Sequence, residues 1–126
     1  MEADIIGHML LQLERGALDR WGKGDPCGYL EISAPEVTYF DPFTPRRLDG
    51  LDSLKEWYTP FAGKIRIDRD ELLDPRVQIV GSAAILTFQY VSHGSEGAKK
   101  WNCTEVYRCE ATDWRIIHTH WSFAAE

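Results

Sequence analysis

The chain has 126 residues, of which 20 are acidic and 14 basic, so its formal net charge is −6. This length suits one domain, and a content of 44% hydrophobic and 27% charged residues excludes a disordered chain. The acidic balance argues against a general binder of nucleic acids or anionic membranes. No segment reaches the roughly 18 consecutive apolar residues of a membrane span, and Glu2 and Asp4 stand where a secretory signal would carry basic residues. We therefore expect one cytoplasmic domain over residues 1–126.

Hydrophobic periodicity predicts helices in the first half of the chain and strands in the second. Apolar residues recur at spacings of three and four over residues 4–21, which is typical of an amphipathic helix. Gly22, Gly24 and the Asp25-Pro26 pair should end this helix. In chain order we expect helices over 4–21 and 27–33, a strand over 37–40, a loop or bent hairpin over 41–50 and a helix over 51–62. Strands should follow over 65–73, over 76–80 (which continues or follows the first), and over 84–92, 100–110 and 114–123. Helices followed by an antiparallel meander predict an α+β fold, with the N-terminal helix covering one face of the sheet.

Alternation along the strand over 100–110 places one acid on an apolar face. Successive side chains point to opposite faces of a strand, so Glu105 shares its face with Trp101, Cys103, Tyr107 and Cys109. A carboxylate in such surroundings must pair with a cation, take up a proton or reach a water-filled cavity. Both a cavity acid and a salt-bridged acid near a strand edge fit the pattern. If the face lines a cavity, we expect burial to raise the pKa of Glu105, and a nearby Asp41 carboxylate to raise it further.

The last strand carries two histidines on one face. Strict alternation places His118 and His120 together with Trp114, Ile116 and Ser122. The two rings could share a metal, but no third ligand is evident, and the alternative is a role in packing or in an interface. We expect no metal and no cofactor, and we expect a homodimer formed through this face.

Asp41 closes the predicted strand over 37–40, next to several aromatic residues. A carboxylate at the end of a strand could lie at the mouth of a pocket, although an Asp-Pro pair also favours a simple turn. The sequence contains no readable phosphate-binding loop and no nucleophile with an adjacent base.

The order of these elements and three motifs resemble the nuclear transport factor 2-like superfamily. The motifs are Val37-Thr38-Tyr39-Phe40-Asp41-Pro42, Gly50 before a helix, and a closing W-x-x-x-H-x-H-x-S run over 114–122. The closing run and residues 74–81 most resemble the association domain of calcium/calmodulin-dependent kinase II, and the run also occurs in SnoaL-like relatives. The resemblance covers roughly residues 5–123. It implies a cystatin-like cone, in which a bent sheet wraps the long N-terminal helix and leaves an open pocket at its wide end, and it implies a dimer.

The superfamily contains enzymes, such as ketosteroid isomerase, and proteins that only bind or assemble. Asp41-Pro42 resembles the segment that carries the general base of ketosteroid isomerase, and Glu105 falls where that enzyme has a protonated acid. The tyrosine of that enzyme would fall near Ala17, on a helix without tyrosine, so we do not expect steroid isomerisation. In the kinase association domain the pocket carries arginines, and Glu105 and Trp121 stand at their positions here, which argues against an anion pocket of that kind.

Two hypotheses about function follow. In the first, the chain binds a small apolar or aromatic molecule and is a cofactor-free acid–base enzyme (an isomerase, lyase or polyketide cyclase-like protein), with Asp41 as base and Glu105 as acid. In the second, it is a non-catalytic ligand-binding or oligomerisation module. In both, the expected partners are a second copy of the chain and a small ligand, not a nucleic acid or a membrane. The residues expected to contact the ligand are Trp21, Tyr39, Trp57, Tyr58, Tyr90, Trp101, Tyr107 and Trp121.

Overall fold

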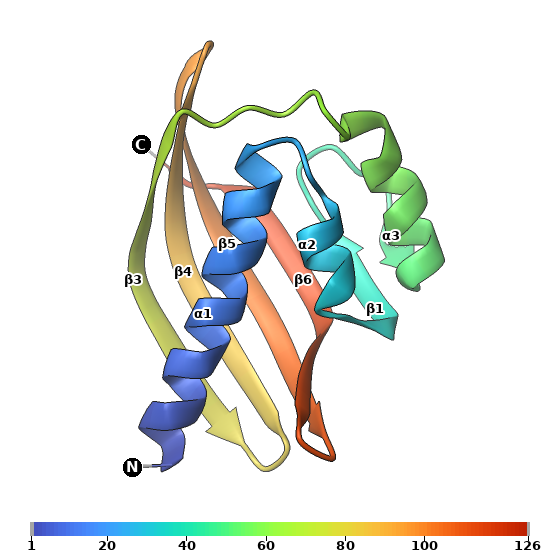
Figure 1. Cartoon of the computed structure of the whole chain (residues 1–126), viewed down its shortest axis with the longest axis vertical. Helices are drawn as coiled ribbons and strands as arrows, with labels where there is room; N and C mark the ends of the chain where they lie inside the picture. The colour runs from blue at the N-terminus through green and yellow to red at the C-terminus, as the bar shows by residue number, and fades with distance from the viewer. Residues whose placement is uncertain (1, 126) are drawn as a thin grey trace.

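A curved six-stranded sheet wraps around the long N-terminal helix (Figure 1). The computed structural model describes residues 2–125. In chain order its elements are α1 (Glu2–Gly22), α2 (Cys27–Glu31), β1 (Ser33–Phe40), β2 (Leu48–Asp49), α3 (Leu51–Tyr58), the 3-10 helix η1 (Thr59–Phe61), β3 (Arg69–Val80), β4 (Ala83–Gly94), β5 (Gly97–Glu110) and β6 (Asp113–Phe123). The predicted α+β class is confirmed.

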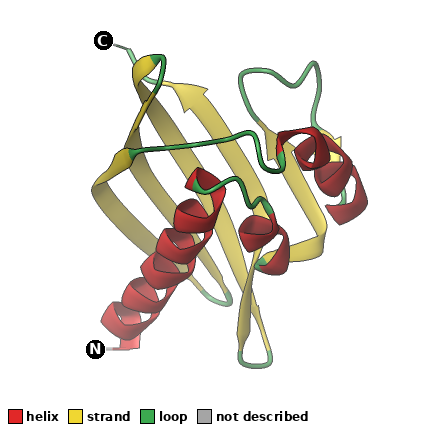
Figure 2. Cartoon of the chain, turned by 45° about the horizontal axis from the view of Figure 1, so that its top comes forward, coloured by secondary structure: helices red, strands yellow, loops and turns green. Residues whose placement is uncertain are grey.

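The strands are arranged in the order β2-β1-β6-β5-β4-β3. β1 runs parallel to β6, and every other neighbouring pair is antiparallel. The strong curvature leaves one face concave, and Figure 2 shows α1 and α2 lying on that face. None of the helices within residues 2–125 is both long enough and apolar enough to cross a membrane.

α1 is held on the sheet by the apolar stripe that its sequence predicts. Leu10, Ala17 and Leu18 are buried in the core between α1 and the sheet. α2 packs closely on α1 because Gly28 has no side chain. A Cβ on this residue would lie only 3.1 Å from the Cα of Ala17. The close approach of the two helices brings Tyr29 of α2 against α1, where its hydroxyl donates a hydrogen bond to Glu14.

The prediction that one face of β6 carries Trp114, Ile116 and both histidines is wrong, because the strand contains a bulge. Tyr107 of β5 pairs with Ile116, whereas the preceding Val106 pairs with His118, so Ile117 is an extra residue in the ladder. An extra residue inverts the alternation of the side chains that follow. Trp114 and Ile116 are therefore buried in the core, while His118 and His120 lie on the outer, convex face.

Other boundaries differ from the predictions for local reasons. The expected helix over 51–62 ends as an α-helix at Tyr58 and continues as η1, where Pro60 cannot donate an α-helical hydrogen bond. Of the two alternatives for residues 41–50, the structure has the hairpin, because the short strand β2 pairs antiparallel with β1. The strands expected over 65–73 and 76–80 form one strand that begins at Arg69 and shifts register near Asp74.

Residues 62–68 form a strap that is tied to α1 and to the β4–β5 hairpin. The backbone N–H of Ile67 donates to the carbonyl of Gly22 at 2.9 Å, and that of Asp68 donates to the carbonyl of His93 at 2.8 Å. Gly63 donates to the carbonyl of Gly24 at 2.8 Å. Gly24 has a φ of +85°, and a Cβ there would meet the Gly63 backbone at 3.0 Å. These bonds replace the strand pairing that was expected before Arg69 and hold the strap across the wide end of the cone.

Candidate functional site

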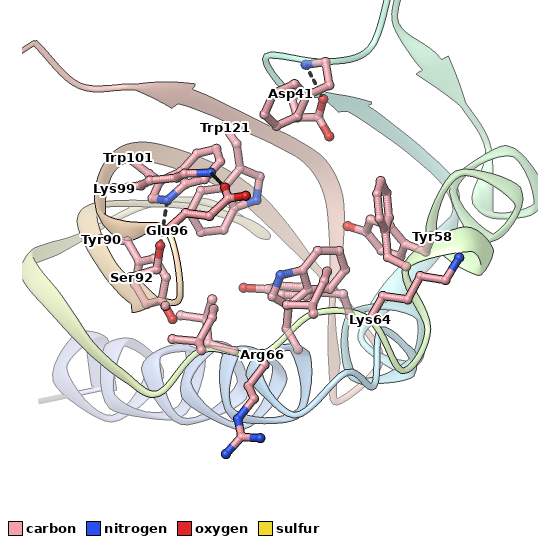
Figure 3. A pocket seen from close by; sticks show the side chains of 18 of the residues that line it. Asp41, Tyr58, Lys64, Arg66, Tyr90, Ser92, Glu96, Lys99, Trp101 and Trp121 are labelled. Atoms are coloured by element: carbon pink, nitrogen blue, oxygen red, sulfur yellow. Dashed lines mark hydrogen bonds and ion pairs between the residues drawn. The ribbon is translucent and has the colours of Figure 1, made fainter.

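A cavity of about 450 Å³ opens at the wide end of the cone (Figure 3). The strap over 62–68, the end of α1, η1 and the β4–β5 hairpin surround it. Aromatic side chains are the most frequent kind in its walls. The aromatic side chains that line it are those of Trp21, Tyr29, Tyr39, Phe43, Tyr58, Phe61, Tyr90, Trp101 and Trp121.

The structure brings most of the predicted ligand-binding residues to this cavity. Those that line it are Trp21, Tyr39, Tyr58, Tyr90, Trp101 and Trp121. Trp57 and Tyr107 do not belong to the lining. The indole of Trp57 donates to Asp41 from α3, and the hydroxyl of Tyr107 points into the protein core, where it donates to Glu14 at 2.8 Å.

Asp41 lines the cavity, and its carboxylate accepts four hydrogen bonds. The backbone N–H groups of Phe43 and Thr44 donate to Oδ1 at 2.8 and 2.9 Å. The Tyr39 hydroxyl and the Trp57 indole each donate to Oδ2 at 3.0 Å. A carboxylate offers about four acceptor positions. The four donors therefore fix the orientation of this side chain and join the end of β1 to α3.

Glu105 does not line the cavity but lies in the core beside a second carboxyl group, that of Glu14. Neither residue is exposed at all. Glu14 Oε1 accepts the hydroxyl of Tyr107, and Oε2 accepts the hydroxyl of Tyr29. Glu105 Oε1 accepts the thiol of Cys103 at 3.6 Å, while its Oε2 meets no donor. The residue that faces Glu105 is thus Glu14 of α1, and not Asp41 as the sequence suggested.

Burial raises the pKa of Glu105 well above its ordinary value, and the neighbouring Glu14 carboxylate raises it further. Burial also raises the pKa of Glu14, but hydrogen bonds from Glu105, Tyr29 and Tyr107 act in the opposite direction. Glu14 and Glu105 therefore share one proton, which is held mainly by the carboxyl group of Glu105. In that state the Glu105 carboxyl donates a hydrogen bond to Glu14.

Glu14 was missed by the sequence analysis, although the sequence carries a signal for it. It lies four residues after Leu10 and four before Leu18, so it falls on the buried stripe of α1. Together with Cys103 and Glu105 it forms the one cluster of three potential metal ligands within residues 2–125, with ligand atoms within 4.8 Å of one another. Both oxygens of Glu14 already accept tyrosine hydroxyls, which favours a proton-sharing cluster over a metal site.

The raised pKa values predict a specific dependence of stability on pH. Because the folded state keeps a proton that the unfolded chain releases near pH 4.3, stability should fall as the pH rises from there through the folded-state pKa. Glu105→Gln removes this titration and keeps the shape. Relative to the wild type, this variant should gain stability with rising pH, by at most about 1.4 kcal/mol per pH unit. Urea unfolding between pH 5 and pH 8 measures the difference.

Glu110→Gln is the matched control, because it makes the same change at an exposed position of β5. Its stability should follow the wild-type pH profile. A Glu105→Gln profile parallel to that of the wild type would show that Glu105 holds no proton in the folded protein.

Comparisons with known proteins agree with the architecture. The family model of the calcium/calmodulin-dependent protein kinase II association domain matches residues 10–125. No curated protein matches the chain. A solved structure from Parabacteroides distasonis, described as that of a candidate ketosteroid isomerase, is 38% identical, with a TM-score of 0.86 over 94% of this chain and 88% of that one.

Two further solved structures show the same fold. The kinase II hub of S. rosetta is 26% identical, with a TM-score of 0.73 over 91% of this chain and 94% of that one. A nuclear transport factor 2-like protein from Salmonella enterica is 20% identical, with a TM-score of 0.74 over 98% of this chain and 94% of that one. The chain has the cone-shaped nuclear transport factor 2-like fold and belongs to the calcium/calmodulin-dependent protein kinase II association domain family.

Proposed function

We propose that this chain binds a small, largely apolar organic molecule in the cavity at the wide end of its cone. The observation that carries the proposal is the size and lining of that cavity. Its volume of about 450 Å³ lies in the range of ligand pockets, and aromatic side chains line it on several sides, while most of its charged lining residues belong to the strap and to the β4–β5 hairpin. Burial of an apolar molecule against such walls supplies most of the binding free energy.

Binding without catalysis is the better supported form of this proposal. A general base must accept a proton, but the acceptor positions of Asp41 are filled by four donors that belong to the protein. A general acid must reach the ligand, but Glu105 is fully buried and outside the cavity lining. The two residues proposed from sequence as a catalytic pair therefore serve the framework around the cavity.

The hydroxyl groups around the cavity give a second argument against enolate chemistry. Stabilising a developing oxyanion requires free hydrogen-bond donors aimed at it. The hydroxyls of Tyr29, Tyr39 and Tyr90 already donate to Glu14, Asp41 and Asp70. The cavity thus has aromatic walls suited to holding a molecule, while three of its four tyrosine hydroxyls are committed to carboxylates.

The proposal predicts saturable binding of a neutral aromatic probe. N-phenyl-1-naphthylamine, whose emission strengthens in apolar surroundings, should bind at one site per chain. Ser92 lines the cavity and accepts the Trp101 indole at 3.2 Å, so Ser92→Phe should fill part of the space and weaken probe binding at least tenfold. A fluorescence titration measures both quantities.

Val91→Phe is the control, since it adds the same ring at the next position of β4, whose side chain points to the opposite face of the sheet. It should leave the affinity unchanged. The absence of saturable binding to the wild type, or equal weakening by both variants, would contradict a ligand site in the cavity.

Self-association is a second candidate function, favoured by the family to which the chain belongs. Proteins matched by this chain include kinase II hubs and an association domain. The convex face of the sheet offers Phe40, Val106 and His118, which are all half-buried in the single chain. The His118 ring lies 5.9 Å from that of Phe40, and its Nδ1 is 2.7 Å from the Thr38 hydroxyl. We propose that two copies of the chain pair through this face.

The dimer should weaken in acid. Burial lowers the pKa of His118, and the neighbouring His120 lowers it further, so the ring is neutral at pH 7. Packing it in an interface opposes its charging, which begins as the pH falls below the ordinary value of about 6.5. Sedimentation at micromolar concentration should show a dimer at pH 8 that dissociates more readily at pH 5.5.

Val106→Glu places a charge at the centre of this face and should give a monomer. Val80→Glu makes the same change at an exposed position beside the β3–β4 turn and should leave the dimer intact. A monomeric wild type at pH 8, or a dimer that tolerates Val106→Glu, would contradict pairing through the convex face.

A further inference from the structure

Three of the four tyrosines that line the cavity already donate their hydroxyl protons to carboxylates, so they can only accept hydrogen bonds from a ligand. Each hydroxyl has one proton. The proton of Tyr39 is donated to Asp41 at 3.0 Å, and that of Tyr90 is donated to Asp70 at 2.5 Å. Tyr29 donates its proton to Glu14. What remains on these hydroxyls is lone pairs, which favour a ligand that donates protons or carries positive charge.

Carboxyl groups that form no ion pair lie at and behind one part of the cavity wall. Within residues 2–125, Asp41, Glu14 and Glu105 form no ion pair with a lysine, arginine or histidine. Asp41 lines the cavity, and the Glu14–Glu105 pair, which shares one proton, lies behind Tyr29. Asp70 differs, because Arg15 neutralises it.

The cationic side chains at the cavity are at its rim. Figure 3 shows Lys64 and Arg66 extending away from the space between the aromatic rings. The Arg66 side chain is 89% exposed and pairs with Asp68 at 3.4 Å, and Lys99 pairs with Glu96 at 3.6 Å. Solvent screens exposed charges of this kind. They therefore offset the field inside the cavity only weakly.

Aromatic rings approach the cavity from two sides. On one side Trp121 meets Trp101 at 6.1 Å and Tyr90 at 5.9 Å between ring centroids, all in edge-to-face arrangements. On the other, Tyr58 lies 4.9 Å from Trp21, also edge to face. Walls of tryptophan and tyrosine attract an organic cation through their negative ring faces, and they do so most strongly where water is excluded.

We propose that the ligand of this cavity is an organic cation, of the quaternary ammonium or alkylamine class. The inference rests on the proposed ligand site and specifies its chemistry. The aromatic walls hold the apolar surface of the cation, and Asp41 with the carboxyl pair behind Tyr29 supplies the opposing charge. An anionic or purely apolar ligand of the same shape would gain the contact area and forgo the electrostatic attraction.

Three probes of closely similar size separate charge from shape. They are phenyltrimethylammonium, the neutral tert-butylbenzene and the anionic benzenesulfonate. NMR titration of each into the wild-type protein should show phenyltrimethylammonium binding at least tenfold more tightly than the other two. Asp41→Asn should reduce this preference at least threefold. Asp113→Asn makes the same charge change at the first residue of β6, away from the cavity lining, and should not alter the preference.

The comparison of probes on the wild type needs no variant, so a destabilised Asp41→Asn protein would not prevent the test. Binding of tert-butylbenzene as tight as that of the cation would overturn the inference and leave the proposed apolar site standing. Tighter binding of benzenesulfonate would overturn it as well. Failure of all three probes to bind would contradict both the inference and the ligand site itself.

Discussion

Two carboxyl groups buried side by side, with no cation paired to them, constrain the centre of this molecule. Glu14 comes from α1 and Glu105 from β5, and neither has any exposed surface. Like charges in such a site cannot both persist, so the pair keeps a proton. Tyr29 of α2 and Tyr107 of β5 complete the cluster by donating to Glu14. The helices are thereby joined to the sheet by directional bonds as well as by apolar packing.

The same arrangement sets the chemistry of the cavity above it. Tyr29 belongs both to the cavity wall and to the buried cluster, and its proton is donated inward to Glu14. Tyr39 repeats the pattern with Asp41, which is itself held by four donors. These polar groups of the wall are therefore committed to the protein framework. The aromatic surface, the acceptor oxygens of these tyrosines and the nearby carboxylates are the features on which the proposed ligand site rests.

Much of this architecture could be predicted from the sequence, because periodicity reports which face of an element is buried. Alternation along β5 correctly placed Glu105 among apolar neighbours, and the order of elements identified the fold. The prediction from alternation was wrong for β6, because a bulge at Ile117 moves the residues after it to the opposite face of the sheet. No residue in this part of the sequence indicates the bulge. The partner of Glu105 was also missed. Glu14 is 91 positions away, and only the packing of α1 against β5 brings the two carboxyls together.

The most direct test of the buried pair is a carbon-detected NMR titration of the side-chain carboxyl groups of Glu14 and Glu105. The two signals should respond together, since each group senses the ionisation of the other. We expect the pair to retain one proton well above about pH 4.3, the ordinary value for a glutamate, because the pKa of Glu105 is raised by burial and by Glu14. Two independent titrations at or below that value would contradict it and would remove the central constraint on the fold and the cavity.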